Sequence, residues 1–252
     1  MILPVRKVPA MRPFVWLRLG WRDFTRTFWP SLLHGLVVAA GGLAIFAVTL
    51  KHWYLLPGAF SGFVLVAPIL ATGLYEQSRL LSRGKQPTLA DAIDAWRRGT
   101  RPLVWLGLLL AVAGTLWVVV SAGLFALFVK TPITSVESFL RYVVQLQGIF
   151  LFLLWLVLGG LGAAVVFAAT AVSPPLLLGR VIDLRGAILT SVRAVGENPA
   201  AMALWATIIM IATGVSMATA MLGFIIAIPV IGHATWHAYR DLVDASSLPL
   251  RN

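Results

Sequence analysis

Residues 103–129 read LVWLGLLLAVAGTLWVVVSAGLFALFV and contain no charged side chain. An apolar run of about 20 residues is long enough to cross the hydrocarbon core of a bilayer as a helix. Four more apolar runs lie at 31–50, 55–75, 149–173 and 200–232. Only 12% of all residues are charged, against roughly 25% in an average soluble domain. The sequence therefore predicts an all-α polytopic membrane protein.

The last apolar run is too long for one ordinary span. Gly214 and Ser216 stand near its middle, and small residues of this kind weaken a helix. We divide the run into two spans at about 200–216 and 219–239, which brings the predicted total to six transmembrane helices.

The distribution of Lys and Arg predicts the orientation of these spans. Of the 20 Lys and Arg residues, 17 fall before the first span, after the second and fourth spans, or in the tail, while Lys51, Lys130 and Arg141 fall in the other loops. Cytoplasmic loops carry the excess of Lys and Arg, so both termini are predicted in the cytoplasm. The same bias explains the net charge of +11 without a nucleic-acid partner.

This topology divides the chain into three parts. Residues 1–30 form a basic interfacial segment in the cytoplasm, residues 31–239 form the six-helix transmembrane domain, and residues 240–252 form a cytoplasmic tail. The protein is predicted to lie in the cytoplasmic (inner) membrane.

A threefold repeat is visible along the chain. Three segments at 21–30, 93–102 and 188–199 precede the odd-numbered spans, mix apolar residues with Arg and end in Pro. Such segments are typical of interfacial helices, and Pro is tolerated at the start of the following helix. The returning spans also carry prolines, which we expect to kink the helices: Pro68, Pro174, Pro175 and Pro229. The pattern predicts three parallel hairpins related about an axis along the membrane normal.

The repeat has two interpretations. Duplicated helical hairpins are a simple way to build a bundle. Alternatively, three Pro-kinked spans surround a cavity that is open to the cytoplasm, since broken helices often line transport sites.

Polar residues gather at the cytoplasmic ends of the first and last returning spans, at similar distances from Pro68 and Pro229. Glu76 directly follows an apolar run, and a carboxylate at the membrane is a functional candidate. The alternative is an ion pair of Glu76 with Arg79 or Arg240. The candidate polar cluster consists of Tyr75, Glu76, Arg79, His233, His237, Arg240 and Asp241.

His233 and His237 are four residues apart and therefore share one face of a helix. Two such imidazoles can bind a metal if a third ligand is present, for which Glu76 and His34 are the candidates. The alternatives are hydrogen bonds to neighbouring helices at the headgroup boundary, or a role in proton sensing or substrate contact. Taken together, the sequence predicts no metal and no cofactor.

No motif for catalysis is present. The sequence has no P-loop, nucleophile elbow, zinc-protease motif or dinucleotide-binding glycine pattern. It has no cysteine, which excludes disulfides and thiol chemistry. Ionisable residues are almost absent within the spans, which disfavours proton pumping and voltage sensing. The chain is therefore predicted not to be an enzyme.

Several short motifs resemble a prokaryotic predicted integral membrane family, domain of unknown function 2189. They are Val5-Arg-Lys-Val-Pro, Gly20-Trp-Arg-Asp23, Gly73-Leu-Tyr-Glu-Gln-Ser-Arg79, Leu89-Ala-Asp-Ala-Ile93 and Gly232-His-Ala-Thr-Trp-His-Ala-Tyr-Arg-Asp241. The resemblance extends over nearly the whole chain, and the last motif is the most specific. It implies six membrane helices in a bacterial protein. It implies no catalytic residues, because the family has no established activity.

The function expected from these features is that of a non-enzymatic bundle that binds lipid, protein or a small molecule from the cytoplasmic leaflet. A transporter with a cytoplasm-facing cavity and a haem- or metal-binding membrane protein are the alternatives. The lipid bilayer is the expected partner, another membrane protein is a further candidate, and no nucleic acid is expected.

Overall fold

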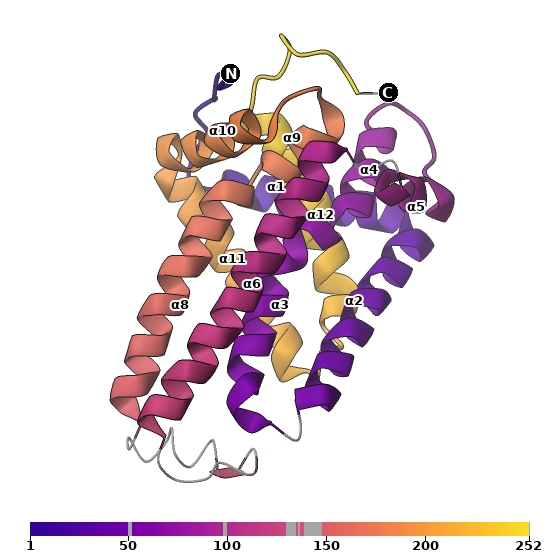
Figure 1. Ribbon diagram of the computed structural model, residues 1–252. Helices are drawn as coiled ribbons and strands as arrows, with labels where there is room; N and C mark the ends of the chain where they lie inside the picture. Colours follow the sequence, from indigo (N-terminus) through magenta and orange to yellow (C-terminus); the bar gives the residue numbers. More distant parts are fainter. Residues whose placement is uncertain (50–51, 98–99, 130–134, 136, 139–147, 252) are drawn as a thin grey trace. The chain divides into compact units, whose positions relative to one another are not determined.

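Helices form most of the computed structural model, and the described residues contain no strand beyond two isolated bridges. The structure describes residues 1–49, 52–97, 100–129, 135, 137–138 and 148–251. The helices (Figure 1) are α1 (Arg12–Arg26), α2 (Phe28–Thr49), the short 3-10 helix η1 (Trp53–Leu55), α3 (Leu56–Leu70), α4 (Thr72–Leu81), α5 (Leu89–Arg97), α6 (Arg101–Phe128), α8 (Ile149–Thr170), α9 (Ser173–Gly179), α10 (Leu184–Glu197), α11 (Pro199–Ala218) and α12 (Phe224–Leu242). The all-α prediction is confirmed for these residues.

Five stretches of the described chain are long and apolar enough to cross a membrane: Phe28–Thr49, Leu56–Leu81, Arg101–Phe128, Ile149–Gly179 and Pro199–Ala218. They correspond to the first five predicted spans and confirm the membrane class. At the place of the predicted sixth span the structure has α12, which is not among the five. The six-span arrangement therefore stays a prediction.

The break between the fifth and sixth predicted spans lies later than expected. Helix α11 continues through Gly214 and Ser216 to Ala218, and α12 begins only at Phe224. Ala220 and Met221 make the turn with φ values of 49° and 70°. Residues other than glycine seldom adopt this left-handed conformation, so the turn is locally strained.

The prolines of the returning spans act in two ways. Pro68 lies inside α3, which ends two residues later before α4 starts, and Pro229 lies inside α12. Pro174 and Pro175 instead occupy the first turn of α9, after the chain has already broken beyond α8. The expectation that they kink a continuous helix is corrected: they begin a helix, where their missing amide protons cost little.

Each predicted interfacial segment belongs to a short helix that precedes a long one. The short helices α1, α5 and α10 lead into α2, α6 and α11, and Pro30, Pro102 and Pro199 lie in the first turn of the long helices. The order of one short and one long helix followed by a return helix thus occurs three times. The rotational relation among the three hairpins stays a prediction.

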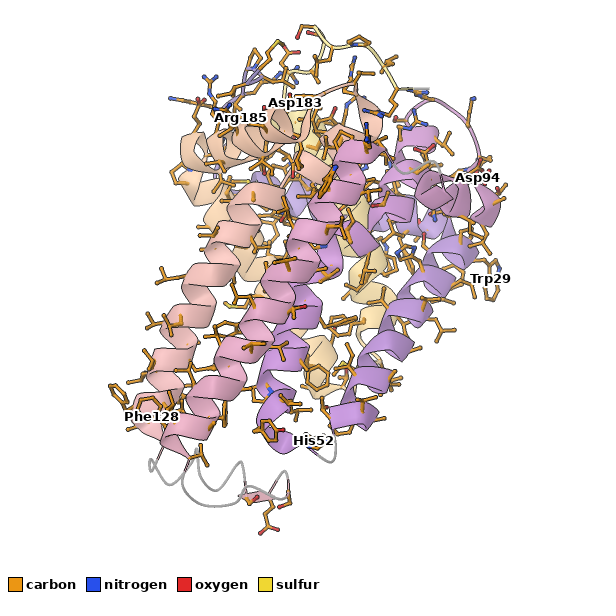
Figure 2. The ribbon with its side chains drawn as sticks, viewed as in Figure 1. Trp29, His52, Asp94, Phe128, Asp183 and Arg185 are labelled. Atoms are coloured by element: carbon orange, nitrogen blue, oxygen red, sulfur yellow. The ribbon has the colours of Figure 1, made fainter. Side chains whose placement is uncertain are left out.

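Helix α1 exposes a face that mixes basic and aromatic side chains. Phe14 and Trp21 are exposed beside Arg18, Arg22 and Arg26. The ring of Trp29, which follows directly in α2, points away from the helix in Figure 2. Amphipathic aromatic rings and Arg side chains favour the boundary between lipid and water.

The chain forms two compact units. Unit 1 contains residues 1–40, 68–107 and 167–252, and unit 2 contains residues 41–67 and 108–166. The residues of the predicted polar cluster all belong to unit 1.

Helix α12 is the central helix of unit 1, where it contacts α1, α4, α9 and α11. Glycines permit the close approach of its neighbours. A Cβ atom on Gly20 of α1 would lie 2.6 Å from the carbonyl oxygen of Val230, and one on Gly35 of α2 would overlap the backbone of Ile225. More than half of α12 is buried by protein, which explains how it can carry polar residues that lipid would not accept.

Within unit 2, α3 and α6 meet through small residues. A Cβ atom on Gly62 would lie 3.1 Å from the carbonyl oxygen of Gly114. Trp155 donates from Nε1 to the hydroxyl of Ser121 at 2.8 Å. Close backbones joined by side-chain hydrogen bonds are typical of helix packing in lipid. Large apolar side chains such as Leu127, 75% exposed, face outward, as a lipid environment permits.

Candidate functional site

A buried hydrogen-bonded network joins α1, α2, α4 and α12. Asp23 of α1 is 1% exposed. Its Oδ2 atom accepts hydrogen bonds from Nε2 of His237 and from the hydroxyl of Ser78, both at 2.8 Å. His233 is fully buried, with Nδ1 2.8 Å from the Ser78 hydroxyl and Nε2 2.9 Å from the Ser31 hydroxyl. We call Asp23, Ser31, Gln77, Ser78, His233 and His237 the buried network.

The contacts of the buried network determine where its protons lie. Ser78 gives its only hydroxyl proton to Asp23, so Nδ1 of His233 must donate to Ser78. A second proton on this ring would place a charge in the interior, which is costly without a counter-charge in contact. His233 is therefore neutral, and its Nε2 accepts the proton of Ser31.

The amide of Gln77 completes this assignment. It lies 3.0 Å from the hydroxyl of Ser31, whose proton is already donated to His233. The two ends of an amide are distinguished only by their hydrogen-bond partners. With Nε2 turned toward Ser31, the amide donates to that hydroxyl, and its oxygen takes the position at which the described chain offers no partner. Every donor in this chain of contacts then has an acceptor.

Helical spacing and close backbone contact explain why the network forms. His233 and His237 are four residues apart and share one face of α12, and Thr27 caps α1 four residues after Asp23. Thr27 accordingly continues the polar face, 2.8 Å from Ser31. The glycine contact of α1 with α12 brings these faces together.

The electrostatics of Asp23 follow from its partners. Burial acts to raise the pKa of this carboxyl, but the hydrogen bond and charge of His237, together with the Ser78 hydroxyl, lower it further than burial raises it. The pKa of Asp23 therefore lies below its ordinary value of 3.8, and the buried network contains a carboxylate at neutral pH.

The predicted metal ligands are engaged in other ways. Both ring nitrogens of His233 contact hydroxyl groups, and Nε2 of His237 donates to Asp23. His34 donates from Nε2 to the carbonyl oxygen of Leu70 at 2.7 Å, at the break between α3 and α4. No group of three or more metal-ligating side chains occurs among the described residues. The arrangement matches the alternative of histidines that hydrogen-bond neighbouring helices.

Glu76 and Arg79 form a second buried group. Their side chains are 2% and 9% exposed. Arg79 donates to both carboxylate oxygens at 2.6 Å, and its third donor reaches the backbone carbonyl of Arg251 at 3.2 Å. This two-pronged geometry is the strongest form of an Arg–carboxylate contact. The alternative of a Glu76–Arg79 pair is thus observed, whereas no ion pair joins Glu76 to Arg240 among the described residues.

Asp241 belongs to a third group at the end of α12. It accepts hydrogen bonds from Nε of Arg12 at 2.6 Å and from the indole of Trp16 at 2.7 Å. Burial acts to raise the pKa of Asp241, but these two donors and the charges of Arg12 and His237 lower it more, so the net shift is downward. Arg12 and Trp16 lie far from Asp241 in sequence, and no local pattern predicts their contact.

The seven predicted residues therefore do not converge on one site. The buried network contains His233 and His237. Glu76 and Arg79 pair with each other, and Asp241 contacts Arg12. Tyr75 is buried in the core, and Arg240 exposes its side chain while its carbonyl accepts from Arg6. Sequence reasoning missed Asp23, Ser31, Gln77, Ser78 and Arg251.

Some signal for the missed residues was available in the sequence. Asp23 and Ser78 occur in two of the motifs quoted for the family resemblance, and Asp23 is an acidic residue in an otherwise basic segment. Nothing in the sequence indicated a role for Arg251, because the short tail that contains it has no periodic pattern.

The N-terminal segment and the tail are both tied to unit 1. Val5 forms a bridge with Val243, and the amide of Val8 donates to the side chain of Asn198 at 2.8 Å. Asn198 also donates to the carbonyl of Arg6 at 3.1 Å. The start of α11 and the end of α12 are therefore connected to the same N-terminal segment, at the end of unit 1 where Figure 1 marks both termini.

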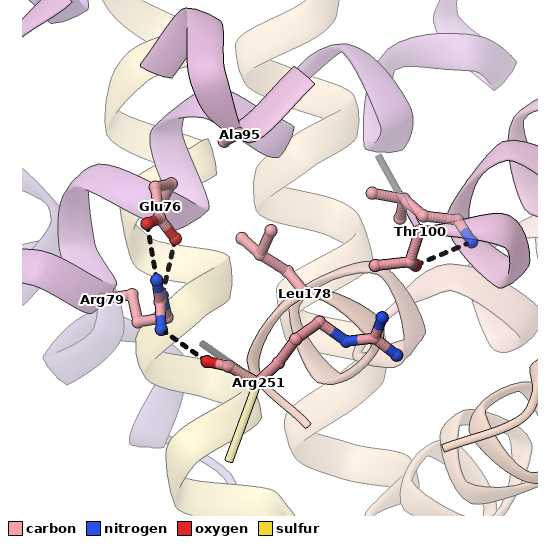
Figure 3. A pocket seen from close by; sticks show the side chains of 7 residues that line it. Glu76, Arg79, Ala95, Thr100, Leu178 and Arg251 are labelled. Carbon is pink, nitrogen blue, oxygen red and sulfur yellow. Dashed lines mark hydrogen bonds and ion pairs between the residues drawn. The ribbon is translucent and has the colours of Figure 1, made fainter. Parts of the chain in front are cut away.

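A small, partly open hollow of about 30 Å³ lies beside the Glu76–Arg79 pair. Apolar and charged side chains share its lining, and Figure 3 shows the side chain of Arg251 extending away from Arg79 toward the side of Thr100. The lining residues are Glu76, Arg79, Ala95, Thr100, Leu103, Leu178 and Arg251.

The fold and these groups define an all-helical integral membrane protein whose polar interior lies in unit 1. Residues 55–179 match the family model of a predicted integral membrane protein, domain of unknown function 2189. Over these residues the match confirms the resemblance stated from the motifs. The match is shorter than the nearly full-length resemblance expected and does not include the motif at 232–241. No curated protein and no solved structure matches the chain.

Proposed function

We propose that the protein is a non-enzymatic, six-span membrane protein that binds a ligand from the cytoplasmic leaflet at the hollow beside Glu76 and Arg79. The lining of the hollow is the main support for this proposal, because it combines apolar side chains with fixed charges at the polar end of unit 1. Ligand sites commonly pair apolar walls with a few placed polar groups.

The path of the chain supports a sixth span. Because Val5 pairs with Val243 and Val8 contacts Asn198, α11 starts and α12 ends beside the same segment. If α11 crosses the bilayer, α12 must return across it. Both chain ends then lie on one side, which requires an even number of crossings.

The charge distribution supports a cytoplasmic position for this side. The hollow lies in the same unit as the basic face of α1, and the positive-inside bias favours a cytoplasmic position for that face. The exposed aromatic rings of α1 would keep this end of unit 1 at the level of the headgroups.

Photocrosslinking tests the proposal without assuming the chemistry of the ligand. Thr100 lines the hollow and would be replaced by benzoylphenylalanine in protein expressed in its membrane, and adducts would be identified by mass spectrometry. The same replacement at exposed Val192 of α10 is the control. We expect a defined adduct at Thr100 and none at Val192. The absence of an adduct at Thr100, or equal adducts at both positions, would overturn the proposal.

A further inference from the structure

Arginines gather around the hollow. Arg79 and Arg251 line it. Arg180 is held next to Arg251 by backbone pairing: Arg180 bridges Leu250, and the amide of Arg251 donates to the carbonyl of Gly179. Nε of Arg251 donates to the carbonyl of Arg180 at 3.3 Å. The tail thus holds Arg251, which lines the hollow, beside Arg180, whose guanidinium donates to the carbonyl of Leu248.

Arg83 and Arg240 extend this positive surface. The pKa of Arg83 is lowered, first by partial burial and then by the positive charges of Arg79, Arg180 and Arg240, while Glu76 opposes the shift. The positive charge of Arg83 is therefore opposed by those of Arg79, Arg180 and Arg240. Burial also lowers the pKa of Arg251.

The carboxylate at this surface is already engaged. Glu76 accepts two hydrogen bonds from Arg79. In the part of the chain that the structure describes, no carboxylate comes within ion-pair distance of Arg83, Arg180, Arg240 or Arg251. Like charges held close together are relieved by a bound anion. We call these four residues the arginine rim.

Guanidinium groups have a geometric preference among anions. Their planar fork of donors matches phosphate oxygens, and they lose hydration more readily than an ammonium group. Ala95, Leu103 and Leu178 supply an apolar wall of the hollow, and Leu103 lies in the first turn of α6. A phosphate with an apolar substituent would use both walls.

We infer that Arg251 binds the phosphate group of an anionic ligand in the hollow, and that the positive charges of the other rim arginines strengthen this binding. This inference rests on the proposed function and specifies its ligand. A phosphate group could come from a phospholipid of the cytoplasmic leaflet or from a soluble phosphate compound, and the experiment has an arm for each source.

The test compares two double variants with equal changes of charge. Arg83→Gln with Arg251→Gln removes two guanidinium groups from the rim, while the backbone pairing of residue 251 is retained. Arg18→Gln with Arg26→Gln removes two exposed charges from α1 and serves as the control. Both would be reconstituted in nanodiscs of phosphatidylcholine alone or mixed with phosphatidylglycerol.

Bound phosphatidylglycerol would be counted by native mass spectrometry after release from the nanodiscs. For a lipid source, we expect wild type and the α1 control to retain phosphatidylglycerol, and the rim variant to bind it about tenfold more weakly for each lost contact. For a soluble source, inorganic phosphate added in neutral detergent raises the unfolding temperature of wild type and the control but not of the rim variant.

Two results would overturn the inference: equal binding of both probes by wild type and rim variant, or equal losses in rim variant and control. The latter would mean that only overall surface charge attracts the anion. A neutral adduct at Thr100 with unchanged rim variants would leave the proposed function standing and reject the phosphate. A missing adduct at Thr100 would reject the proposed function itself.

Discussion

Asp23 of α1 accepts a hydrogen bond from Nε2 of His237 in α12 at 2.8 Å, across 214 residues of sequence. This contact joins the first helix of the chain to the last and is the end point of the buried network. Because Asp23 is an ionised group with almost no exposure, its partners determine whether the two helices can stay together.

Asp23→Asn should destabilise the protein strongly. The substitution keeps the shape of the side chain but removes the charge that accepts from His237 and Ser78, at a cost of about 3 kcal/mol. The fluorescence of the 10 tryptophans would follow unfolding in detergent. Glu197→Gln, in the exposed pair with Arg193, is the matched control and should change stability by less than about 0.5 kcal/mol. Equal effects of the two changes would contradict the structural role of Asp23.

Gly20→Ala should weaken the contact of α1 with α12. The added Cβ would lie 2.6 Å from the carbonyl oxygen of Val230 and 2.7 Å from the amide nitrogen of Ala234, so the backbones must separate, at about 1–3 kcal/mol. Gly214→Ala is the control, since nothing lies within 4 Å of its added Cβ, and alanine favours the helix. A lowered unfolding temperature is expected for Gly20→Ala alone. If both variants were as stable as wild type, the helices would not be as close as the structure shows.

Acid should destabilise the protein partly through Asp241. The pKa of this carboxyl in the folded protein is lowered from 3.8. Its contribution to stability is therefore complete at a pH above the pKa of the unfolded chain, and it is lost as the pH falls through the lower pKa of the folded protein. The unfolding temperature should therefore decrease as the pH drops below about 4. Asp241→Asn should be less stable near neutrality and show a shallower decrease in acid. An identical acid profile in both proteins would rule out the contribution of Asp241.

Asn198→Ala should loosen the N-terminal segment. The substitution removes the acceptor of the Val8 amide and the donor to the carbonyl of Arg6. Hydrogen exchange measured by mass spectrometry should become faster over residues 3–8. Thr207→Ala on the exposed face of α11 should leave this exchange unchanged. Unaltered protection of the segment in Asn198→Ala would show that the bridge of Val5 with Val243 suffices to hold it.

Cysteine labelling can determine whether α12 crosses the membrane as a sixth span, because the protein has no cysteine of its own. Leu222→Cys places a thiol in the exposed turn between α11 and α12, and Ser246→Cys places one in the exposed tail. We expect a membrane-impermeant maleimide to label position 222 only from outside the cell and position 246 only after the membrane is opened. Labelling of both positions from the same side would contradict the return of α12 across the bilayer.

The arrangement of apolar and basic residues was enough to predict the membrane class, five of the spans and the short helices before α2, α6 and α11. These are local properties: the transfer of about 20 apolar side chains into lipid favours a helix whatever its neighbours are. The polar residues of α12 were visible in the same way, as two histidines on one face. The sequence did not predict their partners.

Only the tertiary structure decided that His237 contacts Asp23, that Glu76 pairs with Arg79, and that the tail carries Arg251 to the hollow. Such contacts depend on how closely two distant backbones approach, and at Gly20 that distance is set by the absence of a single Cβ atom. Hydropathy reports which residues leave water, but it contains no information on which helix they meet. The separation of the seven candidate residues into distinct groups is therefore a property of packing rather than of sequence spacing.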